Sequence, residues 1–246
     1  MNKKVVFLGS KKIGLECLKI LNHSSKALNY EIVGVLTNNR GCDIKQYSLK
    51  NNLPLLSSLE EYLKLEKVDI CISVQYHKIL KKIHIKKAKE LIVNLHMAPL
   101  LEYRGCNQFS YAIINNDKEF GTTIHILDEG IDSGDILFEN RFKIPENCWV
   151  EELYQLTFKK SVELFYNSLE DIISLNINPV KQVFLQDKRG CSIHYRNEIE
   201  KLKCIDLNWP KEKIEKHIRA TYMPNFEPPY CIINSKKVFF KLDLQI

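Results

Sequence analysis

Three polar side chains in two separate segments have the types and spacing for proton transfer. Asn94 and His96 end a short apolar run, residues 91–95. If that run is a strand, the amide and the imidazole point to the same side, because side chains alternate along a strand. Residues 128–135 hold two glycines and four acids, which predicts a tight polar loop between strands. A carboxylate from this loop, placed against the histidine, would hold its tautomer and stabilise its protonated form.

Elements that would position these groups follow a repeating pattern of strand and helix. Short β-branched and apolar runs at residues 4–8, 31–36, 69–74, 91–95 and 122–127 alternate with helical patterns at 12–21, 59–65, 107–114 and 149–173. This alternation predicts an α/β fold, a Rossmann-like and mostly parallel sheet flanked by helices. Sites in such folds form at the carboxyl ends of strands, here after Leu8, Val74 and Leu95.

The pattern changes after residue 178. Residues 180–185 read as a strand, 187–190 as a turn, and a short helix starts at Trp209-Pro210 and runs to Arg219. Residues 231–233 and 238–242 flank a polar turn, which predicts a β-hairpin. We therefore divide the chain into a catalytic domain, residues 1–190, and a small C-terminal helix, loop and β-hairpin region, residues 191–246. An isolated hairpin is marginal in water, so we expect this one to form a homodimer interface.

Composition narrows the class of protein. The chain has 246 residues, of which 45% are hydrophobic, and a net charge of +6. No run of about 20 apolar residues occurs, which argues against a membrane span, and the N-terminus lacks a targeting signal, so we expect a cytoplasmic protein. The eight cysteines are scattered, with no spacing for zinc or for a disulfide framework. The charge suits either a solvated surface or an anionic substrate such as a nucleotide diphosphate.

Gly9 to Gly14 does not match the G-x-G-x-x-G pattern of dinucleotide sites, because Lys11 stands at the second glycine. Three other motifs do fall together: Asn94-Leu95-His96, Tyr103-Arg104-Gly105 and the run Gly130-Ile131-Asp132-Ser133-Gly134-Asp135. In this order and spacing they resemble the transferases that use N10-formyltetrahydrofolate. That family includes the methionyl-tRNA, glycinamide ribonucleotide and nucleotide-sugar formyltransferases. The resemblance covers roughly residues 1–190.

The resemblance implies a catalytic trio of Asn94, His96 and Asp132. An amine would attack the formyl carbon, His96 would take the amine's proton, and Asn94 would donate to the oxyanion. One such hydrogen-bond donor typically stabilises the transition state by roughly 3 kcal/mol. Asp132 would orient and stabilise His96. No metal is expected, because the formyl carrier is already activated.

The resemblance also places the two substrates. N10-formyltetrahydrofolate, the co-substrate, would pack on residues 75–80, with the 128–132 loop as the other wall. This gives Gln75, Tyr76, His77, Lys78, Ile79, Leu80, Asp128 and Gly130. For the acceptor we expect Tyr222 or Tyr103 to stack on a base and Arg104, Arg196 or Lys78 to bind phosphates. Asn107 and Gln108 would bind the sugar, and Ser10 and Met97 complete the predicted acceptor contacts.

Two features indicate the branch of the family. Ala98 and Leu101 stand where the family usually has Ser and Pro, and the form Met97-Ala98-Pro99-Leu100 after His96 resembles the nucleotide-sugar enzymes. The sequence after the catalytic domain is also too short for the C-terminal barrel of the tRNA enzymes. We therefore expect formylation of a dTDP-linked 3- or 4-amino-dideoxyhexose for surface polysaccharide biosynthesis. Formylation of another amine, such as methionyl-tRNA or glycinamide ribonucleotide, is the alternative. A non-catalytic nucleic-acid binder, which would show steep salt dependence, is the third.

Overall fold

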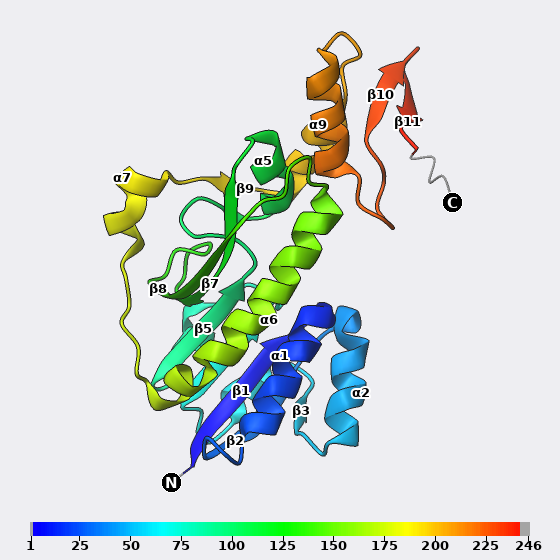
Figure 1. The fold of residues 1–246 in the computed structure, drawn as a ribbon. Coiled ribbons are helices and arrows are strands. Elements are labelled where there is room, and N and C mark those ends of the chain that lie inside the picture. The colour runs from blue at the N-terminus through cyan, green and yellow to red at the C-terminus, as the bar shows by residue number, and fades with distance from the viewer. Residues whose placement is uncertain (1, 242–246) are drawn as a thin grey trace.

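A seven-stranded sheet forms the centre of the molecule (Figure 1). The computed structural model describes residues 2–241. The strand order is β3-β2-β1-β4-β5-β7-β8. The bounds are β1 Lys3–Gly9, β2 Tyr30–Leu36, β3 Leu55–Leu56, β4 Ile70–Val74, β5 Leu91–His96, β7 Glu119–Ile126 and β8 Ile136–Lys143. The first five strands in this order pair in parallel, whereas β7 is antiparallel to both β5 and β8.

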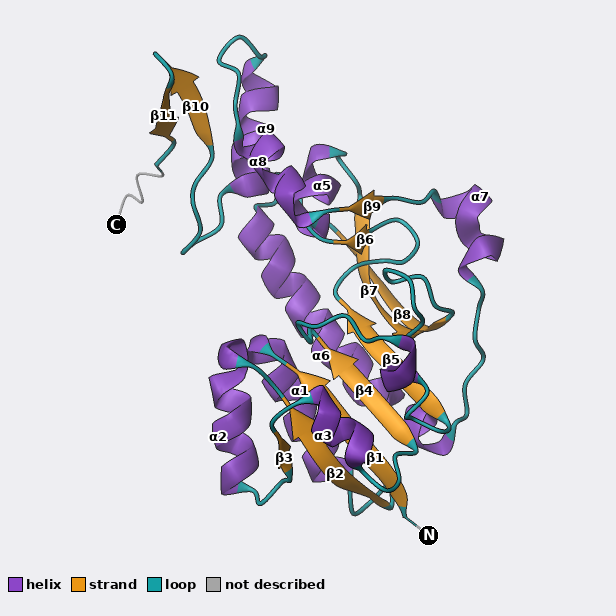
Figure 2. Ribbon diagram, turned by 180° about the vertical axis from the view of Figure 1, so that it is seen from behind, coloured by secondary structure: helices purple, strands orange, loops and turns teal. Residues whose placement is uncertain are grey.

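Helices cover both faces of the sheet. Along β1, Val5 and Phe7 pack with α1 (Lys11–Ser24) and α6 (Val150–Ser174) on one face. Val6 and Leu8 point to the other face and pack with α3 (Leu59–Lys64). α2 (Cys42–Lys50) joins the first face through Ile44, and α4 (Lys82–Ile85) lies with α3 (Figure 2). With both faces covered, near-continuous apolar strands are expected, and the predicted α/β class is confirmed.

The chain then passes along the edge of the sheet instead of joining it. The strand predicted at residues 180–185 is wrong: Val180 makes a single bridge to Ile136, and residues Gln182–Leu185 form a 3-10 helix, η2. The turn predicted at 187–190 is helical as well, since α7 spans Gln186–Arg189. The physical reason is Gln182, whose buried side chain binds backbone carbonyls inside the protein and so turns the chain away from strand pairing.

The C-terminal part returns to the end of the sheet where the candidate site lies. β9 (Ile193–His194) pairs in parallel with β6 (Arg104–Gly105), followed by η3 (Arg196–Glu198), α8 (Ile199–Lys203) and α9 (Lys211–Thr221). α9 packs against α5 (Gln108–Ile114). The division of the chain at residue 190 stays a prediction.

The predicted C-terminal hairpin is confirmed. It consists of β10 (Tyr230–Ile233) and β11 (Lys236–Phe239), and Figure 1 shows it apart from the sheet beside α9. The turn residues Asn234 and Ser235 have φ values of 48° and 61°. Two positive φ angles are what a two-residue type I′ turn requires. Leu242, the predicted end of the second strand, lies outside the described residues. Across residues 2–241, none of the helices combines the length and the apolar character needed to cross a bilayer.

Candidate active site

The site forms at the carboxyl end of β5, where the sheet changes from parallel to antiparallel pairing. Asn94 and His96 lie two residues apart on this strand, and the register sets Asn94 opposite His125 of β7. The chain after β7 turns back through residues 127–135 before β8. In this turn a Cβ at Gly134 would lie only 1.8 Å from the carbonyl oxygen of Ile126, so glycine lets the loop fold close to the strand. Asp132 is thereby brought to the end of β5.

His96 is buried, and its proton is positioned by the backbone. Its Nε2 lies 2.7 Å from the carbonyl oxygen of Tyr103. A carbonyl only accepts, so Nε2 carries the proton and donates it. Nδ1 lies 3.6 Å from Asp132 Oδ2, which is longer than a hydrogen bond of about 2.7–3.2 Å. Neutral His96 therefore has its free lone pair on Nδ1, facing Asp132. The tautomer that we expected Asp132 to hold is held by Tyr103 O.

Asp132 is fixed in its place by the backbone of the neighbouring motif. Its Oδ2 accepts a hydrogen bond of 2.9 Å from the N–H of Gly105, and its own φ is 47°. Burial acts to raise the pKa of Asp132, but attraction to His96 and His125 and the Gly105 hydrogen bond hold this pKa well below its usual value. Asp132 therefore stays ionised at neutral pH. The three predicted side chains do come together, and their roles in catalysis stay a prediction.

His125 belongs to the same cluster, and sequence reasoning missed it. Its Nδ1 lies 2.8 Å from the carbonyl oxygen of Ile126 and donates to it. Its Nε2 is left to accept from Asn94 Nδ2 at 3.2 Å, and lies 3.6 Å from Asp132 Oδ1. The contact fixes the Asn94 amide and leaves its second N–H free. No local signal marks His125, because it meets Asn94 only through antiparallel pairing of β5 with β7.

Gln182 is the second residue that sequence reasoning missed. It is 4% exposed, and its Nε2 donates to the carbonyl oxygens of Asp132 at 2.9 Å and Gly134 at 2.7 Å. Its Oε1 accepts from Arg104 Nη2 at 2.6 Å and Nε at 3.1 Å. One side chain therefore connects the Asp132 loop to the Tyr103-Arg104-Gly105 motif. Arg104, predicted to bind phosphate, thus donates two of its guanidinium N–H groups to Gln182.

The segment predicted to bind the formyl donor lies beside the cluster, between β4 and α4. Gln75 has a φ of 52°, and its carbonyl oxygen accepts from the Ser10 hydroxyl. Leu80 is buried in the core, whereas Ile79 is 84% exposed. Burial raises the pKa of the Tyr76 hydroxyl to about 12, so the group stays protonated. Exposed Ile79 leaves an apolar surface open for a flat ring.

The loop of residues 128–132, predicted as the opposite wall of the donor site, is held by hydrogen bonds within residues 128–133. Asp128 accepts a hydrogen bond of 3.1 Å from Gly130 N and one of 2.8 Å from the Ser133 hydroxyl. Asp128 and Gly130 therefore shape the loop that carries Asp132. Within residues 2–241, no group of three or more His, Cys, Asp or Glu side chains is arranged to hold an ion.

Several side chains predicted to contact the acceptor are buried or hydrogen-bonded within the protein, and their contact with a ligand stays a prediction. Tyr103 is 4% exposed, packs against Phe120 and donates its hydroxyl to Asp117, so its ring is not available to stack on a base. Met97 and Gln108 are also buried. Asn107 is committed to the chain after β9, where its amide donates to Tyr195 O at 2.8 Å. Tyr222, by contrast, is only half-buried, against the edge of Trp149.

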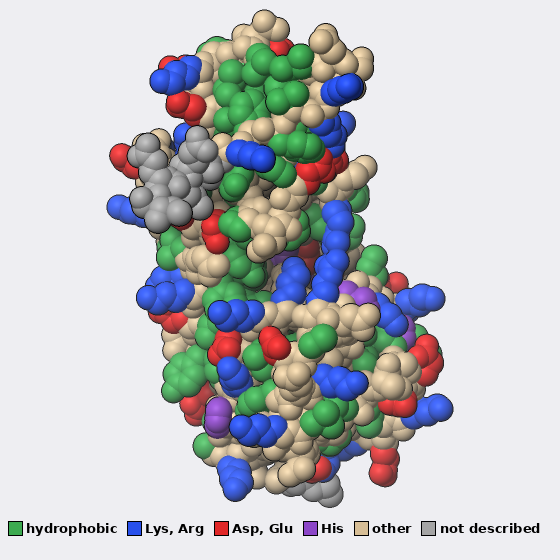
Figure 3. All heavy atoms as spheres, turned by 90° about the vertical axis from the view of Figure 1, so that its right-hand side faces the viewer, with side chains coloured by type: hydrophobic (Ala, Val, Ile, Leu, Met, Phe, Trp, Pro, Cys, Tyr) green, Lys and Arg blue, Asp and Glu red, His purple; other side chains and the backbone are tan. Residues whose placement is uncertain are grey.

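Positive side chains gather near Ser10. Lys11 donates to Gln75 Oε1 at 2.9 Å, and burial together with the nearby Arg40 and Arg196 lowers its pKa. Burial and the charges of Lys78 and Arg40 likewise lower the pKa of His77. Figure 3 shows Lys and Arg side chains along a hollow near the middle of one face. Predicted Lys78 and Arg196 are thus accompanied by Lys11 and Arg40, which sequence reasoning missed.

Comparison with known proteins decides the family. The model of the formyl transferase family matches residues 3–169, more than half of the chain and all of the site just described except Gln182 and the C-terminal contacts. The chain belongs to the formyl transferase family. The predicted family is therefore confirmed.

Curated relatives carry two kinds of name. The methionyl-tRNA formyltransferase of Clostridium novyi is 29% identical over 233 residues, which cover 87% of this chain and 71% of the relative. The GDP-perosamine N-formyltransferase of Brucella melitensis is 32% identical over 168 residues, or 68% of this chain and 62% of the relative. The chain thus spans about two thirds of the length of these curated relatives.

Solved structures of N-formyltransferases share the fold over nearly the whole of this chain. A 4-N formyltransferase from Francisella tularensis is similar with a TM-score of 0.82 and 21% identity, covering 99% of this chain and 98% of that one. An N-formyltransferase from Helicobacter canadensis, solved with folinic acid and dTDP-3-aminofucose, has a TM-score of 0.78 and 24% identity, covering 97% and 86%. A formyltetrahydrofolate deformylase from Pseudomonas syringae covers only 71% of this chain, with 18% identity and a TM-score of 0.63.

Proposed function

We propose that this chain transfers a formyl group from N10-formyltetrahydrofolate to the amino group of a dTDP-linked 3- or 4-amino-dideoxyhexose. The observation that carries the proposal is the cluster at the end of β5. There His96 Nδ1 lies 3.6 Å from the carboxylate of ionised Asp132, and Asn94 is joined to Asp132 through His125. An amide donor, a base and a carboxylate in contact are the groups that acyl transfer to an amine requires.

The proposed reaction uses these groups in two steps. The acceptor amine attacks the formyl carbon, forming a C–N bond and a tetrahedral oxyanion. The free N–H of Asn94 donates to this oxyanion, a contact worth roughly 3 kcal/mol in comparable sites. His96 takes the amine's proton at Nδ1, because Nε2 is committed to Tyr103 O. The oxyanion then collapses, the bond to N10 breaks, and N10 leaves with a proton returned by His96.

Asp132 supports the protonated state of His96 in this scheme. As His96 gains a proton, its charge lies beside a carboxylate that is already ionised, and the 3.6 Å separation can shorten to a hydrogen bond. Asp132 stays in place during this change, because the Gly105 N–H donates to its carboxylate and the Gln182 amide donates to its backbone carbonyl. Asp132 thus stabilises the charged intermediate without taking the proton itself.

Support for a nucleotide-linked acceptor comes from the cations near Ser10. Lys11 lies near both Arg40 and Arg196, which come from two other segments, and such a group of cations would neutralise a diphosphate. Tyr195, adjacent to Arg196, is 56% exposed and offers a ring for the base in place of buried Tyr103. The similarity to sugar N-formyltransferase structures over 97–99% of the chain supports a sugar as the acceptor.

We extend the proposal to the setting of the enzyme. Its product would enter surface polysaccharide, of the O-antigen and lipopolysaccharide type, and the reaction would take place in the cytoplasm. A homodimer would form through the C-terminal hairpin, where Ile232, Ile233, Val238 and Phe239 are all exposed. Pairing with a second copy would bury this apolar surface, which a lone hairpin leaves in water.

A panel of acceptors tests the proposal. The protein is incubated with N10-formyltetrahydrofolate and, separately, with dTDP- and GDP-linked 3-amino and 4-amino sugars, methionyl-tRNA or glycinamide ribonucleotide. Mass spectrometry then detects the gain of one formyl group. We expect formylation of a dTDP-amino sugar, and its loss in His96→Asn while nucleotide-sugar binding persists. Formylation of methionyl-tRNA alone would replace the proposed acceptor, and turnover by His96→Asn near the wild-type rate would remove the role given to His96.

A further inference from the structure

Residues 193–198 carry Tyr195 and Arg196, and they lie outside the part of the chain that the family model matches. They form β9 and η3 and are here called the β9–η3 segment. Both side chains are exposed, and the charge of Arg196 acts on Lys11 at the end of β1. Exposed connecting segments are the more mobile parts of a protein, so a cation carried on one needs contacts that fix it.

The backbone of the β9–η3 segment is held by the start of α5 and by β6. The Asn107 amide donates to Tyr195 O at 2.8 Å. Gly105 pairs with His194, and glycine is required there, because its φ is 86° and a Cβ would lie only 2.3 Å from the His194 carbonyl oxygen. The same Gly105 donates its N–H to Asp132. The segment is therefore anchored at the residue that also holds the Asp132 carboxylate.

Glu198 holds the other end of the segment. Its Oε2 accepts from the Tyr111 hydroxyl of α5 at 2.8 Å and from His194 Nδ1 at 3.1 Å. The Tyr111 and His194 rings also stack, with 3.6 Å between centroids and 15° between planes. Hydrogen bonds from Tyr111 and the Tyr195 backbone, together with His194, hold the pKa of Glu198 below its usual value. Its ionised carboxylate thus connects both sides of Arg196 to α5.

We propose that Glu198 is a positioning residue for the nucleotide-linked acceptor. It fixes η3 so that Arg196 faces Lys11 and the two cations form a ready-made site for a diphosphate. The inference rests on the proposed function, which supplies the nucleotide. Glu198 itself touches no phosphate in this scheme, because two anions repel each other. It restricts the segment before the ligand arrives, so that binding does not have to order the chain.

The sign of the expected effect separates position from charge. Removal of a carboxylate near a diphosphate site would, by Coulomb interaction alone, strengthen binding of the anion. Loss of the contacts that fix η3 weakens binding instead, because fixing the backbone of one residue costs the equivalent of about 5- to 30-fold in affinity. Weaker binding by Glu198→Ala therefore reports on the position of Arg196.

Isothermal titration calorimetry with dTDP or GDP, without folate or sugar, tests the inference through a double-mutant cycle. Arg196→Gln is expected to weaken binding about tenfold to a hundredfold, and Glu198→Ala about fivefold or more. In the double variant, Glu198→Ala is expected to add less than about twofold, because a positioning residue acts only through the residue that it positions. Binding of 5-formyltetrahydrofolate should stay within about twofold of wild type in all three variants.

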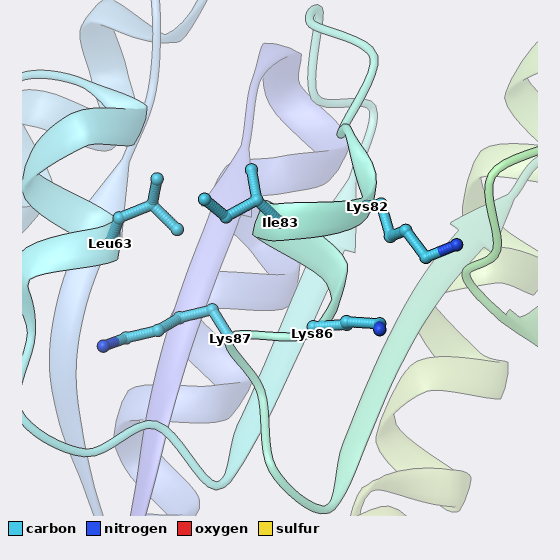
Figure 4. A pocket seen from close by; sticks show the side chains of 5 residues that line it. All are labelled: Leu63, Lys82, Ile83, Lys86 and Lys87. Carbon is cyan, nitrogen blue, oxygen red and sulfur yellow. The ribbon is translucent and has the colours of Figure 1, made fainter.

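Milder variants and a control accompany the cycle. Tyr111→Phe keeps the ring on His194 and removes only the hydroxyl, so it should show a smaller loss, about two- to fivefold. Glu198→Gln keeps an oxygen that accepts from Tyr111 and should recover part of the affinity lost in Glu198→Ala. Lys86→Gln is the control for charge and is expected to bind the nucleotides within about twofold of wild type. It removes an exposed cation from the groove over α4, which is lined by Leu63, Lys82, Ile83, Lys86 and Lys87 (Figure 4).

Additive losses in the double variant would overturn the inference, and so would unchanged or tighter binding by both Glu198→Ala and Tyr111→Phe. A matching loss of folate affinity, or an equal loss in Lys86→Gln, would also overturn it, because the effect would then be general. Wild type that binds neither nucleotide would reject the proposed nucleotide-linked acceptor itself. That outcome is distinct from nucleotide binding that is insensitive to Glu198, which rejects the positioning role alone.

Discussion

Replacing Gln182 with alanine would test whether a residue outside the recognised motifs holds Asp132 in place. The side chain donates to the carbonyl oxygens of Asp132 and Gly134 and accepts twice from Arg104. Alanine removes all four contacts and leaves two carbonyl groups without a partner beside a residue whose φ is positive. We expect the loop to lose its fixed position relative to His96.

The magnitude follows from these contacts. Each bond from Nε2 to a carbonyl contributes about 0.5–1.5 kcal/mol, and a bond to a charged group such as Arg104 about 1.5–3 kcal/mol. The freed conformational entropy of a buried glutamine offsets up to about 2 kcal/mol. With the two Arg104 bonds counted as one contact, these terms total about 2.5–6 kcal/mol, so the net loss in the free energy of unfolding after the full entropy offset is about 0.5–4 kcal/mol. A further misplacement of Asp132 that costs about 1.4 kcal/mol in the transition state lowers kcat tenfold.

Urea unfolding measures the loss of stability, and steady-state kinetics with the amino-sugar acceptor that the panel identifies measure the change in kcat. Gln186→Ala is the matched control, since it truncates the same side chain at an exposed position one turn along the same segment. We expect the control to stay within about 0.5 kcal/mol of wild type. If Gln182→Ala matched the control in both stability and kcat, the argument that Gln182 positions Asp132 would be refuted.

Three other perturbations probe the site and the hairpin. His125→Phe removes the acceptor that fixes the Asn94 amide, so kcat should fall about tenfold to a thousandfold with KM nearly unchanged, and His125→Gln should recover part of it; an unchanged kcat would contradict this. The pKa of Asp132 lies below its usual value, so its carboxylate stabilises the fold above about pH 4, and this contribution is lost as pH falls further. Urea unfolding should accordingly show wild type more stable than Asp132→Asn at pH 7 with the difference shrinking toward pH 3, and a constant difference would count against the assignment. Phe239→Glu should convert a dimer to a monomer in light scattering, whereas Phe226→Glu, another exposed aromatic, should not; a dimer that survives both changes does not use the hairpin.

The core strands and the side on which Asn94 and His96 lie could be predicted from residues close together in the sequence. The apolar runs around Val6, Ile72 and Val93 marked three of the core strands, because a strand buried on both faces needs an almost continuous apolar sequence. Asn94 and His96 could be set on one side of β5 because the period of a strand is two. A carboxylate could be placed against them because the two glycines of residues 128–135 predict a tight loop, and the family resemblance singled out Asp132. These inferences need only neighbouring residues.

Burial of single side chains could not be predicted in the same way. Tyr103 belongs to a motif, and Met97 and Gln108 stand close to motif residues, yet all three side chains are buried. Whether a residue beside a motif faces ligand or core depends on the turn that the chain takes after the strand. The strand predicted over residues 180–185 failed for a related reason, since one buried polar side chain outweighed the β-propensity of its neighbours.

The sequence by itself determined the fold class and the family, because these depend on strand and helix periodicity and on short motifs, and it named Asn94, His96 and Asp132 as candidates. Only the tertiary structure decided how the trio is held. His125 reaches Asn94 through the register of β5 on β7, Gln182 reaches Asp132 from 50 residues away, and Tyr103 sets the proton on His96 through its carbonyl rather than its ring. Such contacts join segments distant in the chain, and strand order and register, which no local pattern records, bring them together.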